Sequence, residues 1–240
     1  MGRCVRHGTL AGLAGGAAMA VVLAVAGEGA IGRAIALETG GGDEVFGRGA
    51  QQAGGMLGAL IFGVVIGTLF GVAFALVRRR MATGDDWRAA VSLAATGFLT
   101  AFAVPFLRYP ANPPGVGDPD TIGRRTALYL LALGWSLVAT WAAWRVARAL
   151  ADRRLPDHVR LPAVAATWMG LVAVGLLALP STSDPLDVPA GLLWQFRLAT
   201  VGGALALWAV TGTVFGWLEI RRAAAAAKAA TEAERAGQPV

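Results

Sequence analysis

Oxygen atoms that could bind a divalent cation are concentrated in two short segments of this chain. The first is the run LETGGGDEVFGRG, and the second is the proline-rich segment PFLRYPANPPGVGDPDTIGRR at residues 105–125. Carboxylate and side-chain amide oxygens are ligands of hard divalent cations, although acidic loops more often serve only solubility. The candidate metal-binding residues are Glu38, Asp43, Glu44, Asn112, Asp118 and Asp120.

The proline-rich segment is predicted to be stiff, because its five prolines fix φ and remove backbone donors. Pro105 is expected to bend or end the preceding helix, and Asp120 to cap the next one. Arg124 and Arg125 would then lie in a first helical turn, where the helix dipole disfavours cations. Either a local ion-pair cluster offsets this, or the arginines orient oxygens that select a cation at the mouth of a pore. The expected charge network comprises Arg108, Asp118, Asp120, Arg124, Arg125 and Arg197.

Catalytic constellations are absent from the sequence. Cys4 is the sole cysteine, and His7 and His158 lack metal-ligand spacing, so both histidines are interpreted as interfacial polar residues. The single lysine, Lys228, stands in an alanine-rich run, so no phosphate-binding loop exists and no ATP binding by this chain is expected. Gly115 to Asp118 match the GxGD of intramembrane aspartyl proteases, but Asp118 precedes Pro119 in a loop and no predicted span contains a carboxylate to complete that pair. We therefore predict neither an enzyme nor a nucleic-acid-binding protein.

The composition is that of a membrane protein, with 56% hydrophobic residues, 15% charged residues and a mean hydropathy of +0.58. Long apolar runs that cross a bilayer must be helical, because lipid satisfies no backbone hydrogen bonds. We predict an all-α polytopic transmembrane bundle of about six spans, with no carboxylate inside any span and hence no proton relay. The predicted spans lie near 8–27, 53–77, 89–107, 126–147, 161–180 and 198–218.

Basic residues indicate the orientation of these spans. Counted on alternate sides, 15 arginines and lysines fall on the side of both termini and six on the other. The positive-inside rule then places both termini in the cytoplasm and residues 105–125 on the external face of an inner membrane. Residues 1–222 are expected to form one transmembrane domain, and residues 223–240 a helical cytoplasmic tail. The first apolar run also resembles a signal peptide, so its cleavage stays an alternative to its retention.

Glycines recur at four-residue spacing within three of the spans, which is typical of helices that pack closely in a membrane. Such ridges more often let helices approach one another than line a conduction path. The glycines concerned are Gly8, Gly12, Gly16, Gly63, Gly67, Gly71, Gly212 and Gly216.

The string PANPPGVGDPDTIGRRTALYL, with RAIALE before it and DVPAGLLWQFRLATVG after it, resembles the CbtA family of predicted bacterial cobalt transporter subunits. The resemblance extends from the first helix to the last. It implies a membrane subunit for cobalt uptake, associated with cobalamin metabolism and paired with a small, single-span, histidine-bearing CbtB subunit. Cobalt would be the transported substrate, with no stably bound cofactor. Family members often carry histidines after the first helix, where this chain has Glu38, Asp43 and Glu44.

These observations lead to two hypotheses of different classes. The first is a membrane subunit of a divalent-metal uptake transporter, which captures the ion at external carboxylates and passes it between glycine-rich helices. The alternative is a non-transporting scaffold that docks a partner through the rigid loop 105–125.

Overall fold

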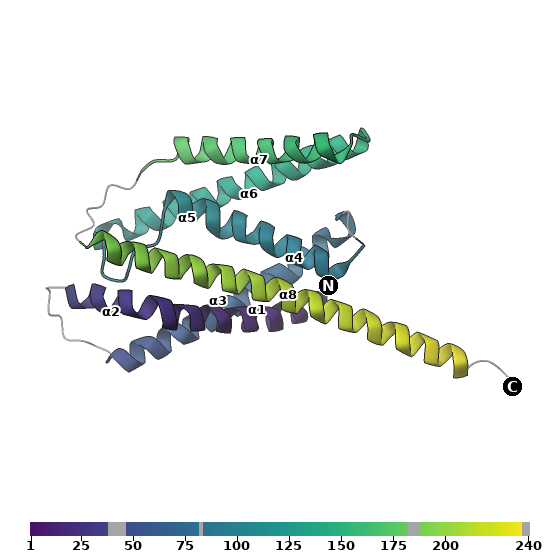
Figure 1. Cartoon of the computed structure of the whole chain (residues 1–240), viewed down its shortest axis with the longest axis horizontal. Helices are drawn as coiled ribbons and strands as arrows, with labels where there is room; N and C mark the ends of the chain where they lie inside the picture. The colour runs from purple at the N-terminus through teal and green to yellow at the C-terminus, as the bar shows by residue number, and fades with distance from the viewer. Residues whose placement is uncertain (38–46, 82–83, 182–187, 237–240) are drawn as a thin grey trace. The chain divides into compact units, whose positions relative to one another are not determined.

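A computed structural model describes residues 1–37, 47–81, 84–181 and 188–236, and its regular elements are all helices (Figure 1). Among the described residues, six helical segments are long and apolar enough to cross a membrane. The predicted all-helical, six-span fold is therefore confirmed. The segments are Gly2–Leu37, Arg48–Arg80, Asp86–Arg108, Pro119–Asp152, Asp157–Ala178 and Ala190–Glu234.

The helices group into two compact units, each described separately below. Unit 1 contains α1 (Gly2–Val22), the π-helical turn η1 (Leu23–Gly27), α3 (Arg48–Val77), the 3-10 turn η2 (Arg78–Arg80), α4 (Asp86–Gly97) up to Thr96, and α8 (Ala190–Ala236) from Ala199 onward. Unit 2 contains α2 (Glu28–Leu37) from Gly29, the π-helical turn η3 (Phe98–Ala103), α5 (Val104–Arg108), the 3-10 turn η4 (Pro119–Thr121), α6 (Ile122–Asp152), α7 (Asp157–Ala178) and the start of α8. One domain over 1–222 stays a prediction, while the alanine-rich run from 223 is helical through Ala236.

Glycines bring two helices of unit 1 into backbone contact. A Cβ atom on Gly12 or on Gly67 would lie well inside 3.0 Å of the facing backbone, so neither position has room for a side chain. Such contact lets two apolar helices gain dispersion energy where lipid offers no hydrophobic driving force. The interlocking positions are Gly8, Gly12 and Gly16 of α1 and Gly63, Gly67 and Gly71 of α3.

Glycines also allow close packing between α8 and α4 in unit 1. A Cβ atom on Gly212 would lie 2.5 Å from the Ala94 side chain, and one on Gly216 would lie 2.8 Å from the Trp87 ring. Phe215, between these glycines, is fully buried and packs edge-on against Phe70 and Phe74 of α3. Small residues thus set the helix spacing, and aromatic rings fill the core between them.

Tryptophan and threonine side chains join the helices of unit 2. Trp135 of α6 donates its ring N–H to the Leu171 carbonyl of α7 over 2.7 Å. The Thr140 hydroxyl receives the ring N–H of Trp168 at 3.1 Å and shares a 2.8 Å hydrogen bond with Thr100. These four side chains therefore have hydrogen-bond partners inside the unit, as a low-dielectric setting favours, whereas the buried Ser136 hydroxyl of α6 has none in the described part of the chain.

Pro105 does not end its helix, which runs without a break from α4 through η3 and α5 to Arg108. A proline lacks the N–H that would bond the carbonyl four residues earlier, which here belongs to Ala101. The hydroxyl of Tyr129 approaches that carbonyl at 3.5 Å, and the π-helical turn ends at Ala103, two residues before the proline. Widened helical geometry is a common way to relieve this strain, and it carries the chain on to Arg108.

Candidate functional site

Two neighbouring side chains attach the proline-rich segment to the end of α7 within unit 2. The Arg108 guanidinium donates to the Leu179 carbonyl, and the Tyr109 hydroxyl donates to the Pro180 carbonyl over 2.7 Å. Both acceptors follow the last turn of α7, where carbonyls have no helical partner. The start of the segment is therefore fixed by hydrogen bonds as well as by its prolines.

Arg197, in the first turns of α8, holds the middle of the same segment. Its Nε donates to the Ala111 carbonyl at 3.2 Å, and its Nη2 donates to Asn112 Oδ1 at 3.1 Å. The planar guanidinium thus binds two oxygens of adjacent residues in a fork, which a lysine could not reproduce. Asn112, a candidate metal ligand, has its amide oxygen engaged by this arginine.

Asp118 organises the end of the segment. Its Oδ1 accepts the N–H of Asp120 at 2.9 Å and thereby caps η4, whereas no side-chain hydrogen bond caps α6 at Thr121. The prediction that Asp120 is the cap is wrong, because η4 begins at Pro119, two residues before the expected helix start, which makes Asp118 the cap. Arg125 donates to the Asp118 carbonyl at 3.2 Å and folds back over Gly117.

Gly117 has a φ of +101°, a conformation that residues with a side chain rarely adopt. A Cβ atom there would also lie 2.7 Å from Nη1 of Arg125. Two features therefore favour glycine at position 117: the positive φ and the guanidinium group close to where a Cβ atom would lie.

The candidate cation ligands divide between described and undescribed parts of the chain. Glu38, Asp43 and Glu44 lie outside the described residues. Asn112 is half-buried, whereas Asp118 and Asp120 are exposed, and so is Arg124 of the expected charge network. Within the ranges that the structure describes, no three His, Cys, Asp or Glu side chains gather closely enough to hold a metal ion.

A pocket of about 530 Å³ opens within unit 2 between the proline-rich segment, α6 and Arg197. Two arginines supply its charge, and its other polar groups are neutral. None of the described residues that line it is acidic. The lining residues are Tyr109, Pro110, Asn112, Pro113, Gly115, Val116, Ile122, Arg125, Thr126, Tyr129, Leu130 and Arg197.

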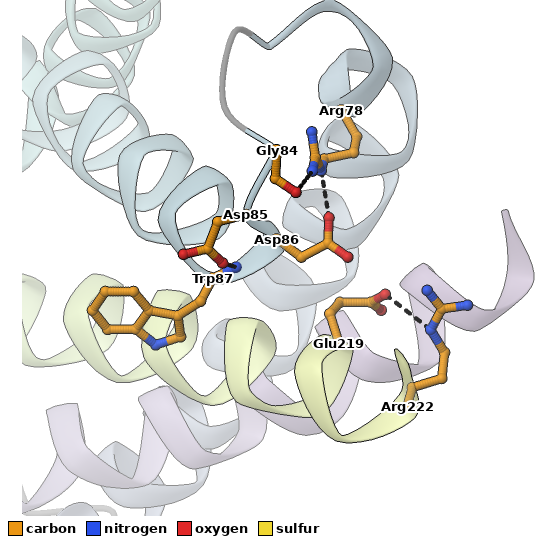
Figure 2. A network of polar contacts seen from close by, with 7 residues as sticks. All are labelled: Arg78, Gly84, Asp85, Asp86, Trp87, Glu219 and Arg222. Atoms are coloured by element: carbon orange, nitrogen blue, oxygen red, sulfur yellow. Dashed lines mark hydrogen bonds and ion pairs between the residues drawn. The ribbon is translucent and has the colours of Figure 1, made fainter. Parts of the chain in front are cut away.

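Unit 1 contains a polar pair that the sequence interpretation missed. Nδ1 of His7, on α1, lies 2.8 Å from Oε1 of Glu219, on α8, and both side chains are buried. Arg222 approaches the other carboxylate oxygen at 3.3 Å, as Figure 2 shows. His158 is exposed and His7 is buried, and the interfacial position expected for both stays a prediction. The predicted absence of a buried carboxylate was wrong, because Glu219 is buried.

A spacing signal for this pair was present in the sequence. The sixth span was predicted to end at residue 218, so Glu219 was placed just outside it. Thr211, Phe215 and Glu219 follow one another at four-residue intervals, which puts them on one face of a helix. All three are buried, so the buried face continues one turn beyond the apolar run.

Figure 2 also shows how the arginine-rich end of α3 is held. Arg78 pairs with Asp86 at 2.5 Å and donates to the Gly84 carbonyl at 3.1 Å. Asp85 accepts the N–H of Trp87 at 2.9 Å at the start of α4. Local pairs therefore join α3 to α4 at the edge of the apolar spans.

Within the described ranges, six long apolar helices and the arginine-rich connections between them define a polytopic helical membrane protein. A family model described as "Probable cobalt transporter subunit (CbtA)" matches residues 1–219. The chain belongs to this family of transporter subunits, which confirms the resemblance inferred from the proline-rich string. No curated protein and no solved structure matches the chain.

Proposed function

We propose that this chain is the membrane subunit of a cobalt uptake system in a bacterial inner membrane. The observation that carries the proposal is the family match over residues 1–219, which includes the described part of every span up to Glu219. Cobalt is the substrate that the family description supports. The imported ion would pass through the membrane domain, with both termini in the cytoplasm and the proline-rich segment outside.

In this proposal the acidic residues collect the ion. Glu38, Asp43 and Glu44 would raise the local cation concentration, and Asp118 and Asp120 would guide the ion past the rigid segment. Both aspartates are exposed, so they could exchange water for a cation rapidly. Arg197 would hold the side-chain amide oxygen of Asn112 in a fixed position beside this path.

Replacing both aspartates tests this assignment. In cells that accumulate cobalt through the wild-type chain, Asp118→Ala with Asp120→Ala is expected to lower the initial uptake rate about tenfold, as the loss of electrostatic steering does. Radioactive cobalt measures the rate, and immunoblotting confirms equal amounts of protein. Uptake unchanged by the double substitution would remove these aspartates from the pathway.

The orientation is testable with one cysteine at a time. In a Cys4→Ser background, Pro114→Cys should react with a membrane-impermeant maleimide in intact cells, because Pro114 is exposed and proposed to lie outside. Cys4 in the wild-type chain should react only after the cells are lysed. Labelling of Cys4 in intact cells, without labelling at position 114, would reverse the topology.

A small single-span, histidine-bearing CbtB-like subunit is the proposed partner. Imidazole binds cobalt more tightly than carboxylates do. That subunit would therefore supply histidine ligands, which residues 105–125 of this chain do not contain.

A scaffold function is the second candidate. It is favoured by the occupation of candidate ligand oxygens, since Asn112 Oδ1 and Asp118 Oδ1 both accept hydrogen bonds from this chain. A scaffold would show no cobalt flux when reconstituted into vesicles with its partner, yet substitutions in residues 105–125 would abolish co-purification. A transporter subunit would show flux, and the same substitutions would change its rate.

A further inference from the structure

We propose that His7 and Glu219 form a transient binding site for a divalent transition-metal ion where α1 meets α8 in unit 1. The site would hold cobalt at the end of the membrane domain that is proposed to face the cytoplasm. The inference rests on the proposed function for the identity of the ion. The site itself is argued from the burial, the ligand atoms and the charges of this pair.

The pair is buried within two segments that are long and apolar enough to span a membrane. His7 is 8% exposed and Glu219 is 4% exposed, and the Phe215 ring lies edge to face with the imidazole at a centroid distance of 6.5 Å. Replacing a buried ion pair by well-packed apolar residues is often neutral or stabilising, so stability alone does not account for this pair. Ionisable side chains within membrane segments commonly mark the path of an ion.

The two facing atoms are suitable ligands for a divalent transition metal. Nδ1 of His7 and Oε1 of Glu219 lie 2.8 Å apart. Two ligand atoms that bind one such ion at about 2.1 Å in adjacent positions stand roughly 3 Å apart, so only a small shift is needed. Imidazole favours cobalt and nickel over magnesium, which prefers oxygen ligands. The ion would displace the proton of this hydrogen bond, which would move to the other imidazole nitrogen or to water.

Arg222 limits the affinity of this site. Its Nε lies 3.3 Å from Oε2 of Glu219, and its positive charge repels a cation. The Arg222 side chain is 37% exposed, so it could extend into water when an ion binds. Within the described residues no three His, Cys, Asp or Glu side chains gather around a metal, so water would complete the coordination. An ion held by two protein ligands beside a positive charge leaves readily, as a transported ion must.

A second polar group lies on the same face of α8. Thr211 is fully buried, and its hydroxyl oxygen has no hydrogen-bond partner among the described residues. It precedes Glu219 by eight residues, about 12 Å along the helix. On α1, Gly15 follows His7 by eight residues, and a Cβ atom there would lie 2.3 Å from Oγ1 of Thr211. The two helices therefore meet at both levels, and the unpaired oxygen could bind the water shell of an ion that moves along this contact.

Equilibrium dialysis of the purified full-length protein, without a polyhistidine tag, against radioactive cobalt tests the proposal. We expect His7→Gln and Glu219→Gln each to weaken binding at least tenfold, since even changes in residues that only orient metal ligands typically cost about 10–100-fold. Glutamine keeps a hydrogen-bonding side chain at each position, and thermal unfolding confirms that the variants are folded. The matched controls are His158→Gln and Glu232→Gln, because both of these side chains are exposed, and their effects should stay below about twofold.

Competition by other ions tests the ligand chemistry. Nickel should displace the bound cobalt, whereas magnesium at the same concentration should not. Displacement by magnesium would overturn the proposal, because the ligands would then be oxygens only. Equal cobalt binding by the wild-type protein and both glutamine variants at positions 7 and 219, or no binding by the folded wild-type protein, would overturn it as well.

Uptake measurements separate this inference from the proposed function. Cobalt binding that depends on His7 and Glu219, without any cobalt uptake by cells, would refute the proposed function and leave the site in place. Cobalt uptake at the wild-type rate in both His7→Gln and Glu219→Gln would refute the site and leave the proposed function in place.

Discussion

Gly67→Ala is expected to destabilise the protein by about 3 kcal/mol, the upper range for adding a methyl group to a packed core. The new Cβ atom would meet backbone atoms of Gly8 and Gly12 well inside 3.0 Å. Backbone cannot rotate away as a side chain can, so α1 would have to move off α3. Thermal unfolding in detergent should show a melting temperature lower by about 6–12 °C.

Gly58→Ala, on the same helix, is the matched control. Its Cβ atom would meet nothing within 4 Å, and alanine is the better helix former by roughly 0.5–1 kcal/mol. The same substitution should therefore stabilise the protein at position 58 and destabilise it at position 67. Equal effects at the two positions would contradict the close packing of α1 on α3.

Glu219→Ala is the second substitution with a large expected effect. It removes the acceptor of the 2.8 Å contact with His7 and leaves that imidazole buried, while Arg222 loses its carboxylate at 3.3 Å. Leaving a buried polar group without its hydrogen-bond partner typically costs about 1–3 kcal/mol, so we expect about 3 kcal/mol here, where two partners lose the same carboxylate. Chemical or thermal unfolding of the purified protein measures this change.

Glu232→Ala provides the control for Glu219→Ala. Glu232 lies on the same helix and pairs with Lys228 at 3.8 Å, but both side chains are more than half exposed. Exposed pairs of this kind contribute about 0.3–0.5 kcal/mol. Comparable losses from the two glutamate substitutions would show that the burial of Glu219 adds nothing to the stability of unit 1.

Apolar length and the need to satisfy backbone hydrogen bonds made the six helices predictable from the sequence. The glycine spacing indicated close packing, because four-residue intervals define one helix face. The spacing did not reveal that Gly12 lies against Gly67, since which face meets which depends on tertiary contacts. The exact helix ends were also hidden, so Asp120 was expected to cap where Asp118 does.

The sequence identified residues of the candidate site, but not which charged side chains would line its pocket. The sequence places Asp118, Asp120 and Arg125 close together along the chain, which suggested a cation site. In the folded chain Arg125 and Arg197 line the pocket, while the two aspartates do not. A carboxylate or a guanidinium can point either way from a loop, so only the fold decides which charge a pocket presents.

Cobalt accumulation in cells tests the proposed uptake function. Cells lacking other cobalt importers would express this chain, a CbtB-like subunit, or both, and would be supplied with radioactive cobalt, with nickel as competitor. We expect accumulation above vector controls when both subunits are present, and loss of that accumulation when this chain is omitted. Cobalt levels equal to the vector control with both subunits in the membrane would contradict a role in cobalt uptake.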